Sequence, residues 1–418
     1  MLDSTTLSFK HLYRATLAAL VALSAQAPTK AQQEEAPSDP FIGIFEEGKV
    51  NLNVRARFSY ADIDGTPDPD EAQAYTLRTL LGFTTGQYYG FNAKVELVDV
   101  RTIDEDTYNG VVSGDPSESV IADPQTTELN QGFLRYANEL GEGVIGRQRY
   151  ILDNARFIGN VGWRQNEQTY DMVLLRATPL PKLTVQYAFI DGVNRIFADE
   201  RDWSSDSHVI HASYAAADFA KLTLYDYYLD LRTNGAPGDL NTFGGFITGS
   251  VPIDEQFTVN YRAELAYQNV NNVTDAEVLY YHLNGGVIFG RFGLSAGYEV
   301  LGSDDGQQQF LTPLATAHKF NGFADAYLNN NGPEGLEDIY VTATANLWKV
   351  KLAASYHWFF ANEDLAADGD DDASEFDLVA SYPITDYLSV LGKAAFYNGG
   401  DGAPADRERF TLQVSFDY

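Results

Sequence analysis

The sequence predicts an all-β fold, a transmembrane antiparallel up-and-down β-barrel of about eighteen strands. Three observations predict it: alternating apolar and polar residues, connections that alternate between short and long, and a final strand that ends on an aromatic residue. The composition agrees, because Tyr 26 and Phe 25 against Met 2 is typical of strands and interfacial aromatic belts. Cys 0 excludes disulfide frameworks and thiolate metal sites.

The first residues have the pattern of an export signal. A basic start precedes the apolar run Ala15–Ala25, which is shorter than the roughly 20 residues of a spanning helix. Ala25 and Ala27 are small enough for a cleavage site, whose position stays open because Pro28 follows. We therefore expect three parts: a signal peptide over 1–27, a periplasmic N-terminal segment over 28–49, and a transmembrane barrel over 50–418.

Strict alternation is clearest in three segments. Val50–Tyr60, Phe257–Gln268 and Lys349–Phe360 each place apolar side chains on one face and polar or small ones on the other. Strands of soluble sandwiches average five or six residues, whereas nine to eleven tilted residues cross a bilayer. The segment length therefore favours a membrane barrel, with no spanning helix anywhere in the chain.

The connections sort by length, which a soluble sandwich gives no reason to expect. The short ones are expected at Gln87, Asn138–Gly143, Pro179–Pro181, Ala215–Ala220, Pro252–Gln256, Gly290, Trp348 and Pro383–Tyr387. The long ones are expected at Asp62–Ala72, Arg101–Gln125, Tyr150–Gln168, Gly192–Asp206, Leu231–Leu240, Asn269–Ala276, Leu301–Glu337, Ala361–Ser374 and Asn398–Asp406. Short periplasmic turns and long extracellular loops are the signature of an outer-membrane barrel.

The C-terminus alternates up to its last residue, from Phe410 to Tyr418. This pattern resembles the closing strand that barrel-assembly machinery recognises, and we expect that machinery as a partner. The alternative interpretation is an ordinary last strand.

Acidic residues are concentrated in proposed outer loops. Residues 62–71, 103–128 and 363–377 contain many of the 59 acidic residues and no Lys or Arg. The net charge of -31 would by itself predict a surface that attracts cations.

The polar faces of the strands carry basic residues instead. A charged side chain on the lipid face costs roughly 2–4 kcal/mol near the midplane, so we expect these residues to face the lumen. A basic constriction favours anions. The alternative is that they pair with lumen acids such as Glu96, Glu264 and Asp377 and only stiffen the wall. The expected pore-lining, anion-selective residues are Arg55, Arg57, Arg78, Lys94, Arg135, Arg147, Arg149, Arg262, Lys393 and Arg409.

Two long connections, 150–168 and 301–337, mix bases, amides and aromatics, which suits contact with anionic sugar rings. We expect them to fold inward and narrow the pore, although ordinary surface loops of this composition are common. The expected constriction or plug residues are Asp153, Asn154, Arg156, Arg164, His318 and Lys319.

Three runs of sequence, Gly146–Asp171, Thr312–Asp325 and Gly335–Asp338, resemble the alginate-export family of outer-membrane porins. The resemblance covers the chain from about Val50 to Tyr418. It implies an eighteen-stranded monomeric barrel whose electropositive lumen passes an acidic uronate polymer. Carried over by position, it supports the following as pore or plug residues: Arg147, Arg149, Asp153, Asn154, Arg156, Arg164, His318 and Lys319.

Catalysis and cofactors find little support in the residues. His208 and His211 are three apart on a strand, hence on opposite faces, and no Ser or Cys beside a His suggests an activated nucleophile. We expect no enzyme activity, no cofactor and no nucleic-acid partner.

One loop has spacing that could gather calcium, through Asp368, Asp370 and Asp372. An EF-hand would need Gly where Ala373 stands and Glu where Val379 stands, so a solvated acidic loop is the alternative. Bridging of lipopolysaccharide by divalent ions is a third possibility.

Two functional hypotheses follow. The first is a passive channel in the bacterial outer membrane for anionic polysaccharide or oligosaccharide, surrounded by lipid and lipopolysaccharide. The second is a plugged barrel that acts as a carbohydrate-binding or adhesion module.

Overall fold

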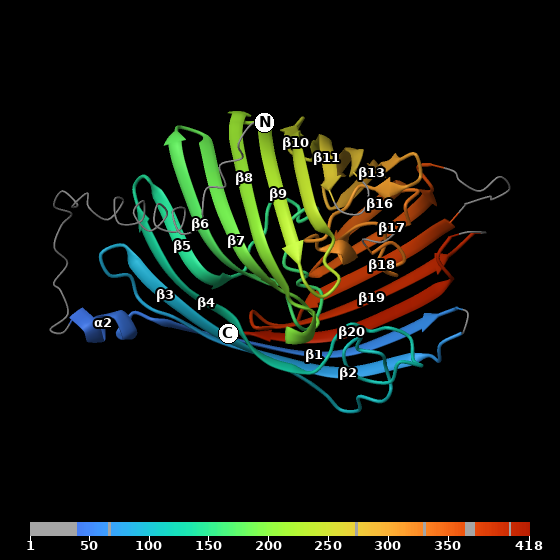
Figure 1. The fold of residues 1–418 in the computed structure, drawn as a ribbon, viewed down its shortest axis with the longest axis horizontal. Helices are drawn as coiled ribbons and strands as arrows, with labels where there is room; N and C mark the ends of the chain where they lie inside the picture. The colour runs from blue at the N-terminus through green and yellow to red at the C-terminus, as the bar shows by residue number, and fades with distance from the viewer. Residues whose placement is uncertain (1–39, 66–67, 272–274, 329–331, 364–372, 401–402) are drawn as a thin grey trace, which may run out of the picture.

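The computed structural model describes residues 40–418 except 66–67, 272–274, 329–331, 364–372 and 401–402, so the predicted signal peptide and calcium loop lie outside the described residues. An 18-stranded antiparallel sheet forms the molecule (Figure 1). The sheet closes because β1 pairs with both β2 and β20. The predicted all-β barrel is therefore confirmed.

The wall strands have the following bounds: β1 (Lys49–Ile63), β2 (Ala72–Thr84), β3 (Phe91–Thr102), β4 (Thr126–Asn138), β5 (Gly141–Gln148), β6 (Thr169–Leu180), β7 (Leu183–Asn194), β8 (Trp203–Ala217), β9 (Ala220–Arg232), β10 (Gly238–Pro252), β11 (Phe257–Asn271), β12 (Asp275–Phe289), β13 (Phe292–Leu301), β16 (Leu336–Leu347), β17 (Val350–Phe360), β18 (Ala373–Pro383), β19 (Leu388–Asn398) and β20 (Arg407–Asp417). The short elements are α2 (Pro40–Glu46), η1 (Asp199–Arg201), β14 (Ser303–Asp304), β15 (Gln308–Gln309) and η2 (Ala317–Lys319).

Neighbours in the wall are neighbours in the chain, as up-and-down topology requires. β13 pairs with β16, because the small hairpin β14–β15 lies within their connection. The turns at one end are tight: Phe289 and Phe292 are paired, and Gly290 takes the left-handed φ of 57° that such a turn demands. The connections at the other end are long, as the sequence predicts.

Alternation along the strands separates two environments. On β2, Leu77 and Leu81 are 45% and 51% exposed and face outward, whereas Thr76 and Arg78 are 3% and 5% exposed and face inward. Exposed apolar side chains are stable here because lipid surrounds them. The wall strands span 8 to 15 residues, and many are longer than the nine to eleven expected.

The period of two breaks where strands bulge. A register shift between β3 and β4 turns the adjacent residues Asn130 and Gln131 both inward, and both donate to one Glu96 oxygen, at 2.8 and 2.7 Å. A bulge inserts one unpaired residue and so changes which face the following residues occupy.

Both ends of the described chain lie at the end of the barrel that carries the short turns. Tyr418 and Leu52 exchange two backbone hydrogen bonds of 2.8 Å, which join the last strand to the first. Before β1, the Ile44 carbonyl of α2 accepts from Gly86 N–H at 2.7 Å, so α2 lies against the β2–β3 turn. Among the described residues, no helix is long and apolar enough to cross a membrane.

Candidate functional site: the lumen and its folded-in loops

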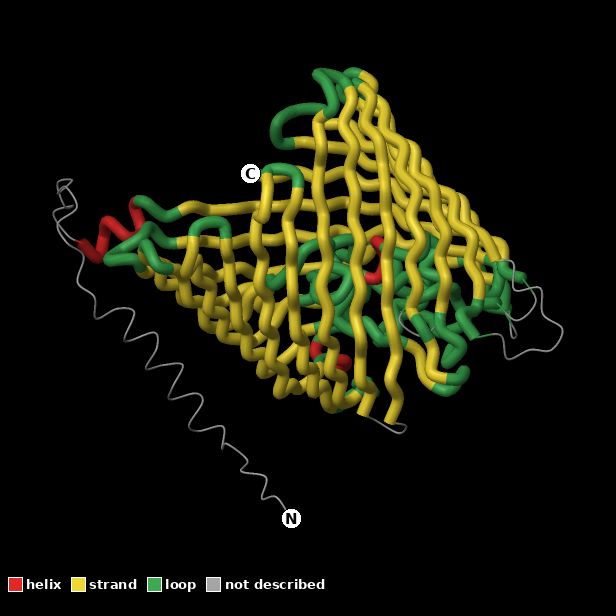
Figure 2. Tube along the Cα trace, turned by 90° about the horizontal axis from the view of Figure 1, so that it is seen from above, coloured by secondary structure: helices red, strands yellow, loops and turns green. Residues whose placement is uncertain are grey.

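Three long connections fold into the barrel (Figure 2). We call residues 103–125, 149–168 and 302–328 the folded-in loops. The second and third are joined by backbone bonds, from Gly159 N–H to Leu314 O at 2.8 Å and from Thr316 N–H to Ala155 O at 3.0 Å. The first joins the second where Asp123 accepts from Gln165 N–H at 2.7 Å. These bonds satisfy backbone groups that would otherwise be buried without partners.

An apolar cluster fixes two of these loops to the wall. Ile158 and Leu314 are fully buried and form a short parallel bridge. The Phe157 ring contacts those of Tyr280 and Phe310, with centroids 5.2 and 5.8 Å apart. The expectation that 150–168 and 301–337 fold inward agrees with this packing, and 103–125 joins them although the sequence marked it only as acidic.

Basic side chains of β1 reach inward to the loops. Arg55 donates to the carbonyls of Gly162 and Arg164 at 3.3 and 3.2 Å. Arg57 forms an ion pair with Asp123 at 3.2 Å and donates to Trp163 O at 2.5 Å. Because these contacts lie inside the barrel, both arginines face the lumen.

The adjoining strands β19 and β20 continue this basic wall. The Lys393 ammonium lies 4.4 Å from the Trp163 ring centroid and contacts His318 Nε2. Arg409 donates to the carbonyls of Ala324 and Val120 at 2.7 and 3.0 Å. Arg407, which sequence reasoning missed, shares the inward phase of Arg409 and donates to Asp325 O at 3.1 Å.

Several lumen bases have carboxylate partners, as the wall-stiffening alternative expects. Within the wall, Lys94–Glu96 measures 2.9 Å, Arg262–Glu264 2.7 Å and Arg135–Glu142 2.7 Å. The pairs that involve the folded-in loops are Arg149–Glu167, Arg156–Glu299 and Arg164–Asp325.

A second group of lumen bases has no such partner. Among the described residues, no carboxylate lies within ion-pair distance of Arg55, Arg78, Lys393, Arg407 or Arg409. The Nε atoms of Arg55 and Arg78 are also buried without a hydrogen-bond partner. Cations without counterions beside a low-dielectric wall create a positive potential in this part of the lumen.

Acidic side chains occupy the adjoining part of the wall, on β13, β16 and β18. Glu375 accepts from Ala324 N–H at 2.6 Å, and Asp377 accepts from Phe323 N–H at 3.2 Å. Glu299 and Asp338 accept from the Asn321 amide at 2.9 and 3.1 Å. The sequence pointed to Asp377 alone, yet all four lie on the inward phase of their strands. They hold loop 302–328 in place.

His318, Asp325 and Arg164 of the folded-in loops form a hydrogen-bonded polar cluster. His318 Nδ1 lies 2.6 Å from Asp325 Oδ1, and Arg164 contacts the other Asp325 oxygen at 2.7 Å. Burial, assisted by Lys393 and Arg164, lowers the pKa of His318 to about 4. Burial alone would raise the pKa of Asp325, but His318 and Arg164 hold it below its usual value. A neutral His318 therefore donates from Nδ1 to Asp325 and accepts from Lys393.

The remaining predicted plug residues lie at the edges of this arrangement. Asp153 accepts from His211 at 2.8 Å and lies 3.7 Å from Lys221, a lumen base that sequence reasoning missed. Asn154 caps Arg156 N–H through its side chain at 3.2 Å, and its carbonyl accepts from Lys319 at 2.9 Å.

Arg147 departs from the predicted lumen set. The register places it opposite Asp171, and the two side chains pair at 2.8 Å. Their chain neighbours Gln148 and Tyr170 face inward, where Tyr170 donates to Gly159 O, so strand alternation turns Arg147 and Asp171 outward. The prediction that Arg147 lines the pore is wrong, because its outward pairing with Asp171 depends on the register of β5 and β6.

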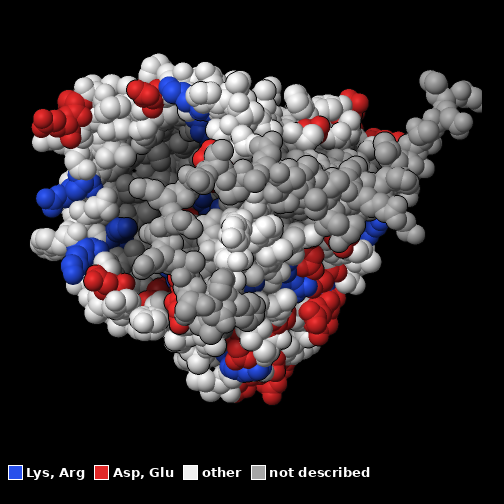
Figure 3. All heavy atoms as spheres, turned by 90° about the vertical axis from the view of Figure 1, so that its left-hand side faces the viewer, with Lys and Arg blue, Asp and Glu red and all other residues white. Residues whose placement is uncertain are grey.

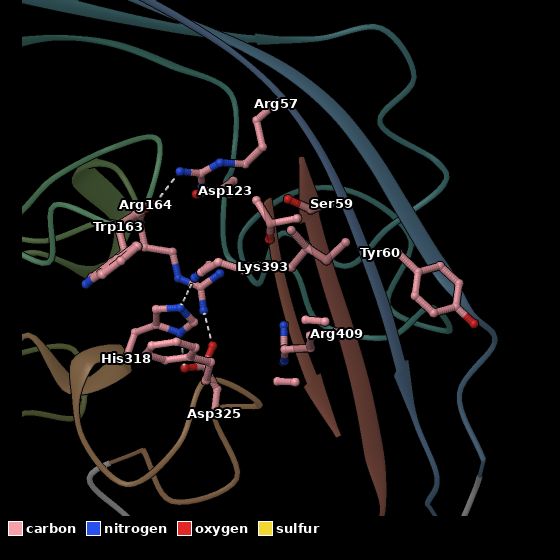
Figure 4. A pocket seen from close by; sticks show the side chains of 15 residues that line it. Arg57, Ser59, Tyr60, Asp123, Trp163, Arg164, His318, Asp325, Lys393 and Arg409 are labelled. Atoms are coloured by element: carbon pink, nitrogen blue, oxygen red, sulfur yellow. Dashed lines mark hydrogen bonds and ion pairs between the residues drawn. The ribbon is translucent and has the colours of Figure 1, made fainter. Parts of the chain in front are cut away.

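Hollows lie along the lumen. The central cavity is lined by both loop and wall residues, among them Arg57, Trp163, His318, Lys393 and Arg409 (Figure 4). A periplasmic recess contains Lys182, Lys221 and Arg262. On the face that carries α2, basic side chains stand at the rim of a hollow (Figure 3).

The chain resembles known proteins in two comparisons. Residues 47–410 match the family described as Alginate export. A search of curated proteins gives no match. Among solved structures, Pseudomonas aeruginosa OpdK with vanillate is similar at TM-score 0.71 and 15% identity, covering 90% of this chain and 100% of that one. Pseudomonas aeruginosa OccK9 (OpdG) follows at TM-score 0.70 and 16% identity, with 90% and 100% covered.

At such low identity the solved structures establish the fold alone. They share the closed barrel with this chain. The family match spans nearly the whole wall, from before β1 to β20. The chain therefore belongs to the alginate-export family of outer-membrane porins.

Proposed function

We propose that this outer-membrane channel passes anionic oligosaccharide or polysaccharide without an energy source. The observation that carries the proposal is the group of lumen cations without carboxylate partners, Arg55, Arg78, Lys393, Arg407 and Arg409. Field lines concentrate in a low-dielectric channel, so these charges raise the local concentration of anions.

Chemical features beside these cations suit a carboxylated sugar. Arginine recognises carboxylates through paired donors, and aromatic faces pack against sugar rings. Trp163 and Phe323 lie beside Lys393 at the central cavity, with ring centroids 4.4 and 5.1 Å from the ammonium. The solved OpdK structure carries vanillate, a small organic anion, which supports organic anions as cargo.

The other parts of the proposal concern placement. We propose that the barrel is a monomer without catalytic activity, assembled by the barrel-assembly machinery. The contact of α2 with the β2–β3 turn supports a periplasmic position for the segment before β1.

Reversal potentials in a salt gradient test the proposal. The full-length protein in a planar bilayer is expected to favour chloride over potassium. The double variant Arg55→Ala/Arg78→Ala is expected to lose most of this preference. The control is Arg101→Ala, which removes an arginine that is 55% exposed on the outward face. A wild-type cation preference, or equal effects of the two sets, contradicts the proposal.

A second function is favoured by the packing of three folded-in loops in the lumen. If that packing is permanent, the barrel is a carbohydrate-binding or adhesion module. The same bilayer recording separates the two, since a plugged barrel gives no conductance steps.

A further inference from the structure

A second polar site lies at the end of the long loops, away from the central cavity. This outer recess forms where residues 195–203, 234–237 and 307–313 meet, with a volume of about 690 Å³. Binding pockets for small molecules usually measure roughly 300–1,000 Å³, so a sugar of more than one ring fits. It shares no lining residue with the central cavity.

Two buried polar atoms at the recess lack hydrogen-bond partners. They are Trp203 Nε1, a donor, and Gln309 Oε1, an acceptor. Trp203 is 6% and Gln309 5% exposed, and both line the recess. An unsatisfied buried donor or acceptor is unfavourable, and a ligand with matching groups would remove that cost.

Two arginines, Arg195 and Arg201, line the same recess. The Arg195 guanidinium stacks 3.9 Å from the Trp203 ring centroid and 4.9 Å from that of Phe197, which fixes its direction. Burial, and then Arg201, lowers the pKa of Arg195 to about 10, so its charge persists at neutral pH.

Acidic side chains do not line the recess, although the chain has 59 of them. Arg195 and Arg201 are its charged lining residues among those described. The side chain of the nearby Asp202 accepts a hydrogen bond from the backbone N–H of Arg195 at 2.7 Å. The charged side chains that line the recess are therefore basic, although Asp199, Glu200 and Asp202 lie in the same segment.

We propose that the outer recess binds a carboxylated sugar at the long-loop end of the lumen. Arg195 and Arg201 hold the carboxylate, Trp203 Nε1–H donates to a sugar oxygen, and Gln309 Oε1 accepts from a hydroxyl group. A neutral sugar lacks the group that the arginines require, and a simple anion lacks the hydroxyl that Gln309 requires. This inference deepens the proposed function and rests on it for the route of the sugar.

Calorimetry on the full-length protein in detergent tests the site, with a galacturonic acid trisaccharide as the probe. Trp203→Phe keeps the ring and removes the N–H, and Arg195→Gln removes the charge. Each is expected to weaken binding about tenfold, the size of one hydrogen bond. The control is Arg232→Gln, an outer arginine that pairs with Asp230 and lies outside the recess. Circular dichroism verifies that each variant retains its barrel.

Three results overturn the inference. They are unchanged affinity in both recess variants, equal binding of a neutral glucose trisaccharide, and tighter binding of glucose phosphate than of the uronide. The proposed function fails separately. The recess variants should leave the chloride preference unchanged, and Arg55→Ala/Arg78→Ala should leave the calorimetric affinity unchanged. Binding without anion selectivity contradicts the proposed function alone, and selectivity without binding contradicts this inference alone.

Discussion

Arg55 on β1 and Arg78 on β2 lie directly opposite each other in the sheet, and both face the lumen. Like charges in opposite positions destabilise a pair of strands. Asn53 reduces the cost by accepting from Arg78 at 2.6 Å, and two loop carbonyls do the same for Arg55. Neither charge is neutralised by a carboxylate, so the pair produces a positive potential that attracts an anion.

Replacing Arg78 with Glu should therefore remove more anion preference than replacing it with Met. Arg78→Glu adds a carboxylate that pairs with Arg55, which cancels two positive charges instead of one. At an effective dielectric constant near 20, each lost charge weakens attraction by about 1 kcal/mol, or roughly fivefold in permeability ratio. Reversal potentials measure both ratios. Equal effects of Glu and Met would show that Arg55 does not act with Arg78.

Arg156 and Glu299 form a buried ion pair between loop 149–168 and β13. Their atoms are 2.8 Å apart, and the two side chains are 3% and 4% exposed. Tyr280 also donates to Glu299 at 2.7 Å. Arg156→Met leaves that carboxylate buried without its cation and should lower the free energy of unfolding by about 3–5 kcal/mol.

Urea unfolding followed by tryptophan fluorescence measures this change. The double variant Arg156→Met/Glu299→Met serves as the control, since removal of both charges is close to neutral in many proteins. A double variant as unstable as the single one would mean that Arg156 acts through packing and not through its charge.

His318 and Asp325 predict a pH dependence of the folded-in loops. The pKa of His318 is about 4 when the loop is docked, against an ordinary value of 6.5. Between these two pH values, His318 binds a proton in a released loop but not in the docked loop. Docking is therefore fully favourable above pH 6.5 and weakens as the pH falls toward 4, by up to tenfold per pH unit. The lowered pKa of Asp325 acts in the same direction below its ordinary value of about 3.9.

If the docked loops narrow the pore, conductance recorded from pH 8 down to pH 4 should fluctuate more as the pH falls. His318→Gln should remove the dependence, since Gln cannot gain a proton. His208→Gln is the control, because His208 contacts Tyr187 on the wall and not the loops. An unchanged pH response in His318→Gln would assign the effect to another group.

The barrel wall was predictable because its signal is local. Alternation with a period of two marks each strand, and the sequence from Phe410 to Tyr418 marks the closing strand. Extending the same alternation to the strand ends would also have found Lys221 and Arg407. The bulge at Asn130 was not predictable, because both of its inward side chains depend on Glu96 of the neighbouring strand.

The site was only partly predictable for a related reason. Which lumen cations stay unpaired depends on contacts between residues far apart in the chain, such as Arg164 with Asp325 and Arg57 with Asp123. The composition identified 149–168 and 302–328 as polar loops. It did not predict the backbone hydrogen bonds of Gly159 and Thr316 that join these loops. Those bonds decide which side chains line the central cavity.

Arg147 gives the sharpest contrast between sequence and structure. Sequence reasoning expects Arg147→Ala to weaken anion preference, whereas its outward ion pair with Asp171 predicts no change in selectivity. Loss of the arginine leaves Asp171 unpaired on the outward face, where each charge is costly, so thermal stability should fall instead. Arg147→Leu/Asp171→Leu should recover that stability, because both new side chains suit lipid. Reversal potentials and melting of the folded band on gels separate the two interpretations, and a lost chloride preference in Arg147→Ala would return this residue to the lumen.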